Sequence, residues 1–342
     1  MQRVFVTGAQ GFVGRYLVSR LLERNQRISV LGIGRSADQR ATFTHVVRLA
    51  GEVVPAPLPP DVAAHVRRPS YAYRAVDLND VAAMTALLRD FAPNSVFHLA
   101  SGLRDDDPRT LFRTNVDGTI ALLDAIDAAK VQPDAIVLGS SGGVYGAAAE
   151  LPIGEHARCE PVDLYSVSKL ASEHASRIVA RSAVLPVIWA RLFNIVGAGQ
   201  DERHVCGRFA SQIAAIALDR TPGELHTGDL TTTRDFIDVR DLADALILLA
   251  ARATPGMAYN VGSGEETLIQ SILYKMLANA GLEDSVTLTS SAYRNADVRR
   301  HVADITQLRS LGFARRFSLD ESVADVYRYY LGAFAATGSV PA

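Results

Sequence analysis

Three glycines, spaced three residues apart, directly follow a short apolar segment at the N-terminus. Residues 3–7 are typical of a buried strand, and the segment that follows the third glycine has the period of an amphipathic helix. A strand, a glycine-rich turn and a helix in this order can receive a pyrophosphate at the helix N-terminus. Gly8 would permit the tight turn, Gly11 the close approach of the phosphates, and Gly14 the packing of helix on strand. We therefore predict a dinucleotide site; the alternative is a glycine-rich turn without a ligand.

Short apolar runs alternate with longer segments of helical period, most clearly in the first half of the chain. This alternation indicates a parallel sheet with helices on both faces, an α/β doubly wound fold of the Rossmann type. After Arg191, glycines separate shorter elements. We expect a dinucleotide-binding domain over residues 1–190 with a return around 230–260, and a smaller C-terminal substrate-binding region at 191–229 and 261–335. The predicted strands lie near residues 3–7, 28–32, 73–76, 95–99, 135–140 and 186–191, and the predicted helices near 11–24, 81–91, 108–130 and 165–181.

The charge balance and the apolar pattern exclude several classes of protein. The 342 residues include 35 basic and 37 acidic ones, and a formal net charge of -2 argues against nucleic acid or an anionic membrane as the main partner. The longest apolar run, residues 245–251, is too short to cross a bilayer. The first residues show no secretory signal. Two cysteines, Cys159 and Cys206, lack metal-ligand spacing and are predicted to be free thiols. We expect a cytoplasmic protein without a metal site.

Two further segments are predicted to carry no chemistry. The connection at residues 48–72 contains four prolines between positions 55 and 60, which excludes a central strand and indicates a surface excursion. The acidic run Asp105–Asp107 precedes Pro108, and Asp107 is therefore interpreted as a helix N-cap in preference to a metal ligand.

The end of the second predicted strand bears on the choice of cofactor. An acidic residue about 20 positions after the glycines would bind a ribose hydroxyl and favour NAD(H). The sequence has Arg35 and Ser36 there, and an arginine can pair with a 2′-phosphate. NADP(H) is therefore favoured, NAD(H) stays possible, and an ordinary surface arginine is the alternative. Asp77 and Leu78, after the third predicted strand, would flank the adenine, although Asp77 could equally be a plain strand-end residue.

Tyr165 and Lys169 stand four residues apart at the start of a predicted helix and so project from one face. A free phenol has a pKa of about 10, and a neighbouring ammonium favours the phenolate, so this pair could exchange protons near neutrality. Lys169 is one of only three lysines in an arginine-rich chain, which strengthens this interpretation over a solvated helix pair. Ser141, at the end of the fifth predicted strand, would lie at the carboxyl edge of the sheet, where its hydroxyl could donate to an oxyanion.

The segment around Ser141 also satisfies the Gly-x-Ser-x-Gly pattern of serine hydrolases. A nucleophile elbow needs a helix immediately after the serine, whereas residues 142–152 are rich in glycine and alanine and have no clear helical period. Hydrolysis is therefore disfavoured.

Taken together, these motifs resemble those of the extended short-chain dehydrogenase/reductases that act on nucleotide sugars. The resemblance covers nearly the whole chain, and later segments such as Arg191–Asn194 and Tyr259–Gly264 agree with it. Within the family, residues 197–200 and 209–214 look most like reductases of GDP-linked 4-keto-6-deoxy-mannose. Its further marks are Thr7–Gly14, Val96–Ala100, Asn115–Thr119, Ser140–Gly146, Tyr165–Glu173 and Arg234–Asp241.

The resemblance implies roles for single residues. Ser141, Tyr165 and Lys169 would form the catalytic set, with Tyr165 passing a proton to the substrate carbonyl and Lys169 also holding the nicotinamide ribose. Asn194, Arg234 and Arg294, with Ser141, would hold a nucleotide-diphosphate sugar, and a surface ion pair is the alternative for each arginine. The helices at 108–130 and 165–181 would pair across a homodimer. The implied cofactor contacts are Gly8, Gly11, Phe12, Val13, Gly14, Arg35, Ser36, Asp77, Leu78, Leu99, Ala100, Ser101, Asn115, Tyr165 and Lys169.

Two departures from the family pattern narrow the reaction. Sugar 4,6-dehydratases of this family carry an Asp-Glu pair where this chain has Gly142 and Gly143, so dehydration is disfavoured. The reductases compared above often have an acidic residue at the position of Gly143. The leading expectation is an NADPH-dependent reductase, followed by an NAD-dependent nucleotide-sugar 4-epimerase. A silent dinucleotide sensor is a third possibility, although Tyr165 and Lys169 are both present.

Overall fold

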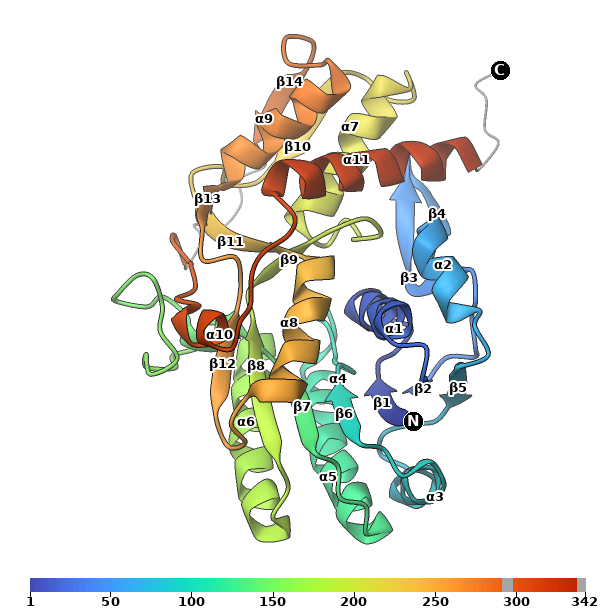
Figure 1. The fold of residues 1–342 in the computed structure, drawn as a ribbon. Helices are drawn as coiled ribbons and strands as arrows, with labels where there is room; N and C mark the ends of the chain where they lie inside the picture. The colour runs from blue at the N-terminus through green and yellow to red at the C-terminus, as the bar shows by residue number, and fades with distance from the viewer. Residues whose placement is uncertain (291–297, 337–342) are drawn as a thin grey trace.

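A parallel sheet forms the centre of the molecule (Figure 1). The computed structural model describes residues 1–290 and 298–336. Among these residues, seven strands pair in parallel in the order β12-β8-β7-β6-β1-β2-β5. The order reverses beside β1, which is the topology of a doubly wound nucleotide-binding fold. The strands are β1 (Gln2–Thr7), β2 (Ile28–Gly34), β5 (Tyr71–Ala75), β6 (Ser95–His98), β7 (Ala135–Ser141), β8 (Val187–Leu192) and β12 (Ala258–Val261).

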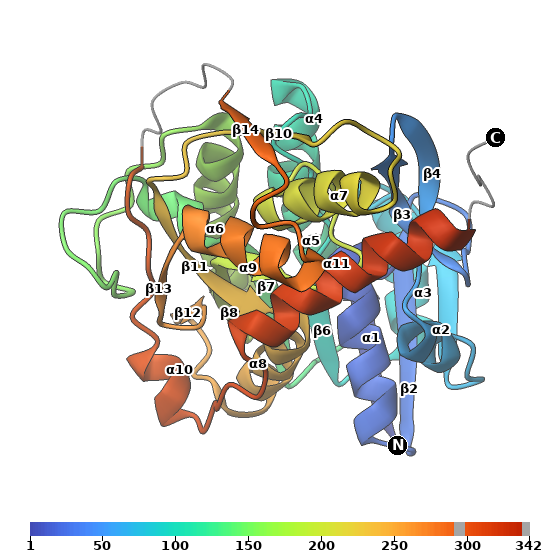
Figure 2. The same ribbon diagram turned by 90° about the horizontal axis from the view of Figure 1, so that it is seen from above.

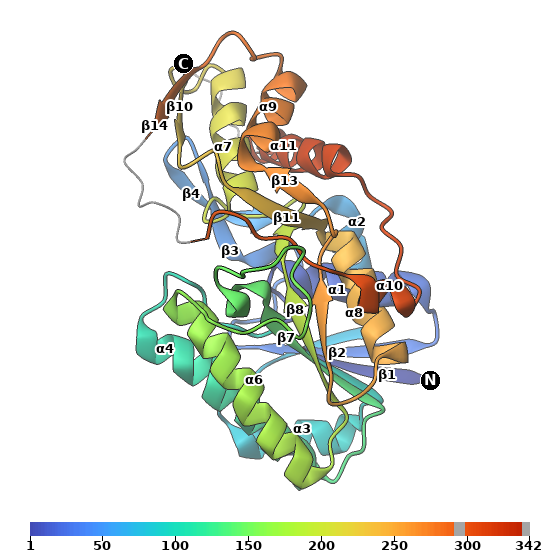
Figure 3. The same ribbon diagram turned by 90° about the vertical axis from the view of Figure 1, so that its left-hand side faces the viewer.

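Helices cover both faces of this sheet because its strands are apolar on both sides (Figure 3). Val4 and Val6 of β1 face one layer, which holds α1 (Phe12–Arg24) and α8 (Val239–Arg252). Phe5, between them, belongs to the core of the other layer, since successive strand residues point to opposite faces. That second layer holds α3 (Val81–Phe91), α5 (Gly118–Ala129) and α6 (Leu164–Ala183). The α/β fold expected from the sequence is confirmed.

A smaller region of mixed structure lies beyond the carboxyl ends of the strands (Figures 1 and 3). Its helices α9 (Ile269–Ala280) and α11 (Leu319–Ala336) pack against α7 (Val205–Ala217). After β11 the chain returns through α8 to β12 at the edge of the central sheet. The strands of this region are β9 (Asn194–Val196), β11 (Thr233–Asp238), β13 (Glu266–Leu268), β10 (Glu224–Thr227) and β14 (Thr287–Ser290), and α10 spans Thr306–Ser310.

The proline-rich connection forms a hairpin, which the sequence did not reveal. β3 (Thr42–Leu49) and β4 (Glu52–Pro57) pair antiparallel, and α2 (Pro60–Val66) follows. Among the described residues β3 is the sole partner of β4, so the prolines of β4 interrupt no central ladder. The hairpin lies beside the end of α11 (Figure 2), where the Tyr329 hydroxyl donates to the Pro57 carbonyl at 3.0 Å.

The helix expected at 108–130 is divided. α4 (Pro108–Phe112) passes through one π-helical stretch, Arg113–Asp117, into α5. The carboxylate of Asp107 accepts the amides of Arg109 and Thr110, which confirms its interpretation as an N-cap.

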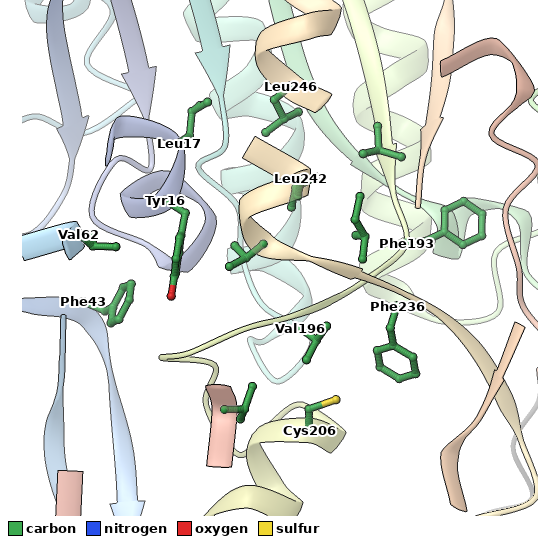
Figure 4. Close-up of a cluster of buried hydrophobic side chains, with 14 of the residues drawn as sticks. Tyr16, Leu17, Phe43, Val62, Phe193, Val196, Cys206, Phe236, Leu242 and Leu246 are labelled. Carbon is green, nitrogen blue, oxygen red and sulfur yellow. The ribbon is translucent and has the colours of Figure 1, made fainter. Parts of the chain in front are cut away.

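One apolar cluster joins the two regions of the molecule (Figure 4). Tyr16 of α1 and Leu242 of α8 come from the sheet side, and Val196 and Cys206 come from the smaller region. Phe43 of the hairpin stacks on Tyr16, with ring centroids 6.5 Å apart. Cys206 and Cys159 are free thiols, as expected. Within residues 1–290 and 298–336, the helices are all too short or too polar to cross a membrane.

Candidate active site

The glycine loop after β1 has the geometry that its sequence predicts. Gly8 has a positive φ of 66°, and a Cβ added there would lie 2.6 Å from the Ala100 amide nitrogen. A Cβ on Gly14 would lie 2.1 Å from the Gly8 carbonyl oxygen, because α1 packs directly on the turn. No side chain caps the N-terminus of α1 at Gly11. The first amides of this helix are therefore open to an anion such as a pyrophosphate.

A single large cleft connects this loop with the smaller region. Its volume is about 1590 Å³, which exceeds the range of about 300–1,000 Å³ for one small-molecule site, so two ligands can lie side by side. Most of the residues proposed from the sequence line it. They are Gly8, Gly11, Phe12, Val13, Gly14, Arg35, Ser36, Asp77, Leu78, Leu99, Ala100, Ser101, Ser141, Tyr165, Lys169, Asn194 and Arg234.

Two of the proposed residues are placed differently. Asn115 is buried beneath the cleft, where its side-chain oxygen accepts the Gly102 amide at 2.8 Å and the Ser101 hydroxyl at 3.0 Å. It therefore shapes the loop after β6 from below. Arg294 lies outside the described residues.

Tyr165 and Lys169 stand on the first turns of α6, which begins where Asp163 accepts the Ser166 amide at 2.7 Å. The Lys169 ammonium donates to the Gly139 carbonyl at 2.9 Å and lies 5.8 Å from the centre of the Tyr165 ring. Burial lowers the pKa of Lys169 to about 8. Burial also raises the pKa of Tyr165, so the expected lowering by Lys169 is not found. The phenol consequently holds its proton at neutral pH and can act as an acid.

Arg104 is a second cation beside the tyrosine, and no motif in the sequence pointed to it. Its guanidinium lies 5.3 Å from the centre of the Tyr165 ring and pairs with Asp163 at 2.6 Å. Burial is the largest influence on the pKa of Tyr165, and Arg104 is the first of those that oppose it. Sequence reasoning interpreted the neighbouring acidic run only as a cap and therefore passed over the residue before it.

Ser141 ends β7 at the carboxyl edge of the sheet. Its hydroxyl oxygen accepts the Gly143 amide at 3.0 Å and begins a short 3₁₀ helix over Gly142–Tyr145. This four-residue turn differs from the long helix of a nucleophile elbow. Among the described residues, no histidine is hydrogen-bonded to Ser141, so a base for a nucleophilic serine is missing there.

The space over the two glycines after Ser141 is filled by other side chains. A Cβ on Gly143 would lie 2.4 Å from the Ser166 hydroxyl oxygen. A Cβ on Gly142 would lie 3.0 Å from both His301 and Phe193. The Nε2 of His301 is 3.1 Å from the Gly142 carbonyl, and burial lowers the pKa of this imidazole to about 4, so it is neutral at pH 7. A side chain at either glycine would therefore require these neighbours to move.

Arg234 of β11 lines the far end of the cleft, with Asn194 at the start of the adjacent β9. The Arg234 guanidinium donates to the Thr233 carbonyl at 2.7 Å, and none of the ion pairs among the described residues includes it. Burial lowers its pKa, and the like charge of Arg104 lowers it further. Two guanidinium groups that line the same cleft and repel each other form a favourable site for a shared anion.

At the opposite end, Arg35 is exposed at the carboxyl end of β2 and takes part in no ion pair among the described residues. Asp77 accepts the Asn79 amide at 2.9 Å, and this bond is the main reason that its pKa is lowered. Asp77 therefore closes the turn after β5 and also lines the cleft. In residues 1–290 and 298–336, no group of three or more His, Cys, Asp or Glu side chains could hold a metal ion.

Comparisons with known proteins agree with this geometry. Residues 4–262 match the NAD dependent epimerase/dehydratase family. A GDP-6-deoxy-D-mannose reductase from Pseudomonas aeruginosa is 30% identical over 305 residues, which cover 87% of each chain. A UDP-glucose 4-epimerase from Mycolicibacterium smegmatis is 29% identical and covers 96% of this chain and 98% of its own. The structure of RMD from Pseudomonas aeruginosa complexed with NADPH superposes with a TM-score of 0.79 at 27% identity, covering 97% of this chain and 100% of that one. The chain belongs to the NAD dependent epimerase/dehydratase family and is an NAD(P)-dependent enzyme.

Proposed function

We propose that the chain is an NADPH-dependent reductase of a nucleotide-linked 4-keto-6-deoxy sugar, of the GDP-4-keto-6-deoxy-mannose type. The observation that carries this proposal is a protonated Tyr165 beside Gly142 and Gly143, which carry neither the acid nor the base of a dehydratase and have no open space above them. A site with a proton donor and no eliminating pair favours reduction of a carbonyl. The similarity to the GDP-6-deoxy-D-mannose reductase of Pseudomonas aeruginosa supports the substrate class.

The residues at the cofactor end fit a dinucleotide with a 2′-phosphate. The N-terminus of α1 has no side-chain cap and therefore suits a pyrophosphate. Gly8 and Gly14 have no side chain that would block this position, and their surroundings leave no room for one. Arg35 and Ser36 line the cleft after β2, where they would hold the phosphate on the adenosine ribose. When bound, the nicotinamide supplies the hydride that reduces the carbonyl carbon.

The chain itself supplies the proton and holds the charges. Tyr165 would donate its phenolic proton to the carbonyl oxygen as that oxygen gains negative charge. The Ser141 hydroxyl, at the edge of β7, would donate a hydrogen bond to the same oxygen. Lys169 remains an ammonium below a pH of about 8 and would hold the nicotinamide ribose.

Arg234 would bind the diphosphate of the sugar nucleotide, and Arg104 would reach the same anion from the opposite wall. Both guanidinium groups line the cleft. An anion bound between them would offset the electrostatic repulsion between their positive charges. Asn194 would orient the same group through its amide.

The decisive experiment follows NADPH absorbance with a panel of GDP-, UDP- and dTDP-linked 4-ketosugars. We expect stoichiometric oxidation of NADPH with at least one 4-keto-6-deoxy sugar and no oxidation with the Tyr165→Phe variant. Absence of turnover across the panel would overturn the proposal.

A nucleotide-sugar 4-epimerase is the second candidate. The similarity to the Mycolicibacterium smegmatis epimerase extends over 96% of this chain, and such an enzyme would use the same Ser141, Tyr165 and Lys169. The two functions separate cleanly in one preparation. A protein that purifies with bound NAD and interconverts sugars without net redox change is an epimerase, whereas consumption of added NADPH identifies a reductase.

We also propose that the chain forms a homodimer in the cytoplasm through α5 and α6. Two apolar residues of α6, Leu164 and Ile178, are 51% and 71% exposed, which is costly on a helix that faces only water. Sedimentation of the purified protein should show a dimer, and Ile178→Glu should yield monomers. The surface variant Arg181→Glu is a matched control at the end of the same helix. A wild-type chain that sediments as a monomer would contradict the dimer but not the reductase.

A further inference from the structure

The loop at residues 36–42, which follows the Arg35 strand end, has its backbone carbonyls turned toward the protein interior. Three side chains from other elements hold the loop in this arrangement, because each of them donates to one or two of its carbonyl oxygens. The bonds are Tyr73 Oη to Ser36 O at 3.0 Å, Gln10 Nε2 to Ala37 O at 2.9 Å, Arg15 Nη2 to Thr42 O at 3.2 Å, and Arg15 Nη2 to Gln39 O.

Gln10 and Arg15 act on this loop as one unit. Arg15 donates to the Gln10 side-chain oxygen at 2.8 Å, and the same oxygen accepts the Gln39 amide at 2.6 Å. The Gln10 amide group also lies 3.5 Å from the Ser36 hydroxyl oxygen, and Ser36 lines the cleft. Gln10 is 2% exposed and Arg15 is 0% exposed, so Arg15 holds the loop from below without reaching the cleft.

The charge on Arg15 has no direct counterion. Among the described ion pairs none includes Arg15, and its Nε and Nη1 atoms are buried without hydrogen-bond partners. Burying a guanidinium in this way costs free energy, because the charged group is removed from water. Burial accordingly lowers the pKa of Arg15. Asp38 of the same loop is the acidic group that acts on this charge, and it also pairs with Arg40. An anion bound above the loop would offset the positive potential that remains beneath it.

The orientation of the carbonyls decides what the loop offers on its outer side. In a trans peptide the amide hydrogen points opposite to the carbonyl oxygen, so inward carbonyls at Ser36 and Ala37 turn the amides of Ala37 and Asp38 outward. Neither amide has a partner among the described residues. Outward amides, the Ser36 hydroxyl and the exposed Arg35 are all hydrogen-bond donors, which suits a phosphate and gives a ribose hydroxyl little to donate to.

We propose that Gln10 and Arg15 are positioning residues for the 2′-phosphate of NADP(H), so that selectivity against NAD(H) depends on this buried pair as well as on Arg35. This inference rests on the proposed preference for NADPH and deepens it. It assigns part of the selectivity to residues on the glycine loop and α1, away from the strand end where the direct contact lies.

The test measures affinities of the full-length protein for NADPH and NADH, and for the fragments 2′,5′-ADP and 5′-AMP, by titration calorimetry. The variants are Gln10→Met, which keeps the length of the side chain and removes its hydrogen bonds, Arg15→Met, and the conservative Arg15→Lys. Arg35→Ala removes the direct phosphate contact. Arg24→Met is the matched control, because it removes an arginine from the same helix that contacts Asp244 and not the loop.

We expect Gln10→Met and Arg15→Met to lower the ratio of NADPH to NADH affinity by about tenfold or more, the size of one or two hydrogen bonds to a charged group. Arg15→Lys should restore part of the ratio, and Arg24→Met should leave it unchanged. A purely structural defect would weaken both cofactors equally and leave the ratio at its wild-type value. If Arg15→Met does not fold, the Gln10→Met variant carries the test.

The outcomes distinguish this inference from the proposed function. A folded Gln10→Met variant that retains the wild-type ratio, while Arg35→Ala loses it, overturns the role of the buried pair and leaves the reductase intact. A wild-type protein that binds 5′-AMP as tightly as 2′,5′-ADP overturns both the pair and the NADPH preference. Failure to reduce any ketosugar, with the ratio shifted in the variants, overturns the reductase alone.

Discussion

The two ends of the cleft offer different groups to the anions that we propose bind there. At the end proposed for the cofactor, backbone amides would hold most of the anion. The first amides of α1 are open because Gly8, Gly11 and Gly14 bring no side chains to the turn. At the end proposed for the substrate, the groups offered to an anion are long guanidinium side chains, Arg234 of β11 and Arg104 of the loop after β6.

This difference determines how each end responds to change. A backbone site is rigid and leaves little room for added atoms, since a Cβ on Gly14 or Gly8 would meet main chain at 2.1 or 2.6 Å, and one on Gly11 at 3.3 Å. A side-chain site loses one donor at a time and leaves the fold unaltered. Substitutions of the turn glycines should therefore largely abolish cofactor binding, whereas substitutions at the substrate end should weaken substrate binding by degrees. Four variants test this contrast.

Tyr165→Phe, at the junction of the two ends, should have the largest effect. The substitution removes only the phenolic hydroxyl, which is the proposed proton donor. General acid catalysis contributes about 10²–10⁴-fold to a reaction rate. We expect kcat for ketosugar reduction to fall by that factor while NADPH still raises the melting temperature. A loss below about tenfold would assign the proton to another group.

Gly14→Ala should disable the cofactor end. The new methyl group would lie 2.1 Å from the Gly8 carbonyl oxygen, so the turn and α1 must separate. We expect affinity for NADPH to fall by about a hundredfold or more, comparable to the loss of two charge-assisted hydrogen bonds. Gly256→Ala is the control, since a Cβ at this surface glycine meets nothing within 4 Å, although its φ of 86° carries some strain. Normal cofactor affinity in Gly14→Ala would refute the backbone site.

Arg234→Gln should weaken the substrate end by a smaller amount. The loss of a charged donor to a diphosphate corresponds to about 1.5–3 kcal/mol, so KM for the nucleotide sugar should rise by about ten- to a hundredfold. Cofactor affinity should stay at its wild-type value, because Arg234 lies at the far end of the cleft. Equal weakening of both ligands would show that the two ends are not independent.

The smallest effect is expected on acid stability. His98, beneath the cofactor end, contacts the hydroxyls of Thr7 and Thr119, and burial lowers its pKa to about 3. Between pH of about 6.5 and 3 the unfolded chain therefore binds a proton that the native chain does not, so stability falls as the pH drops through this range. The His98→Gln variant should be less stable than the wild type at pH 7. Its free energy of unfolding should depend less steeply on pH in this range, by about one bound proton. An unchanged slope in urea unfolding would contradict a neutral His98.

The same contrast explains what the sequence could predict. The central strands of the first part and the glycine turn were predictable because strands buried on both faces form continuous apolar runs, and because the turn needs glycine at fixed positions. The edge strand β5 was predictable from its alternation of buried and exposed residues. The β3–β4 hairpin was not predictable, because Pro55 and Pro57 argue against a strand unless it lies at an edge.

Residues of the substrate end were harder to predict. Arg104 and His301 stand in loops without a motif. The loop after β6 brings Arg104 to Tyr165, and the segment around His301 reaches Gly142 because it pairs with Ile153 of the loop after β7. Asn115 matched a family pattern, but its position beneath Ser101 depends on the π-helical stretch between α4 and α5, which no local pattern revealed. Side chains that converge from distant segments leave no contiguous signal in one sequence.

The packing over Gly142 and Gly143 also limits the reactions that this chain could acquire by mutation. An acidic residue at Gly143 would run into the buried hydroxyl of Ser166, and one at Gly142 would displace His301 and Phe193. A single substitution toward a dehydratase would therefore cost stability before it could add an activity. At least one neighbour would have to move aside first, so the route to water elimination depends on a rearrangement that brings no catalytic benefit of its own.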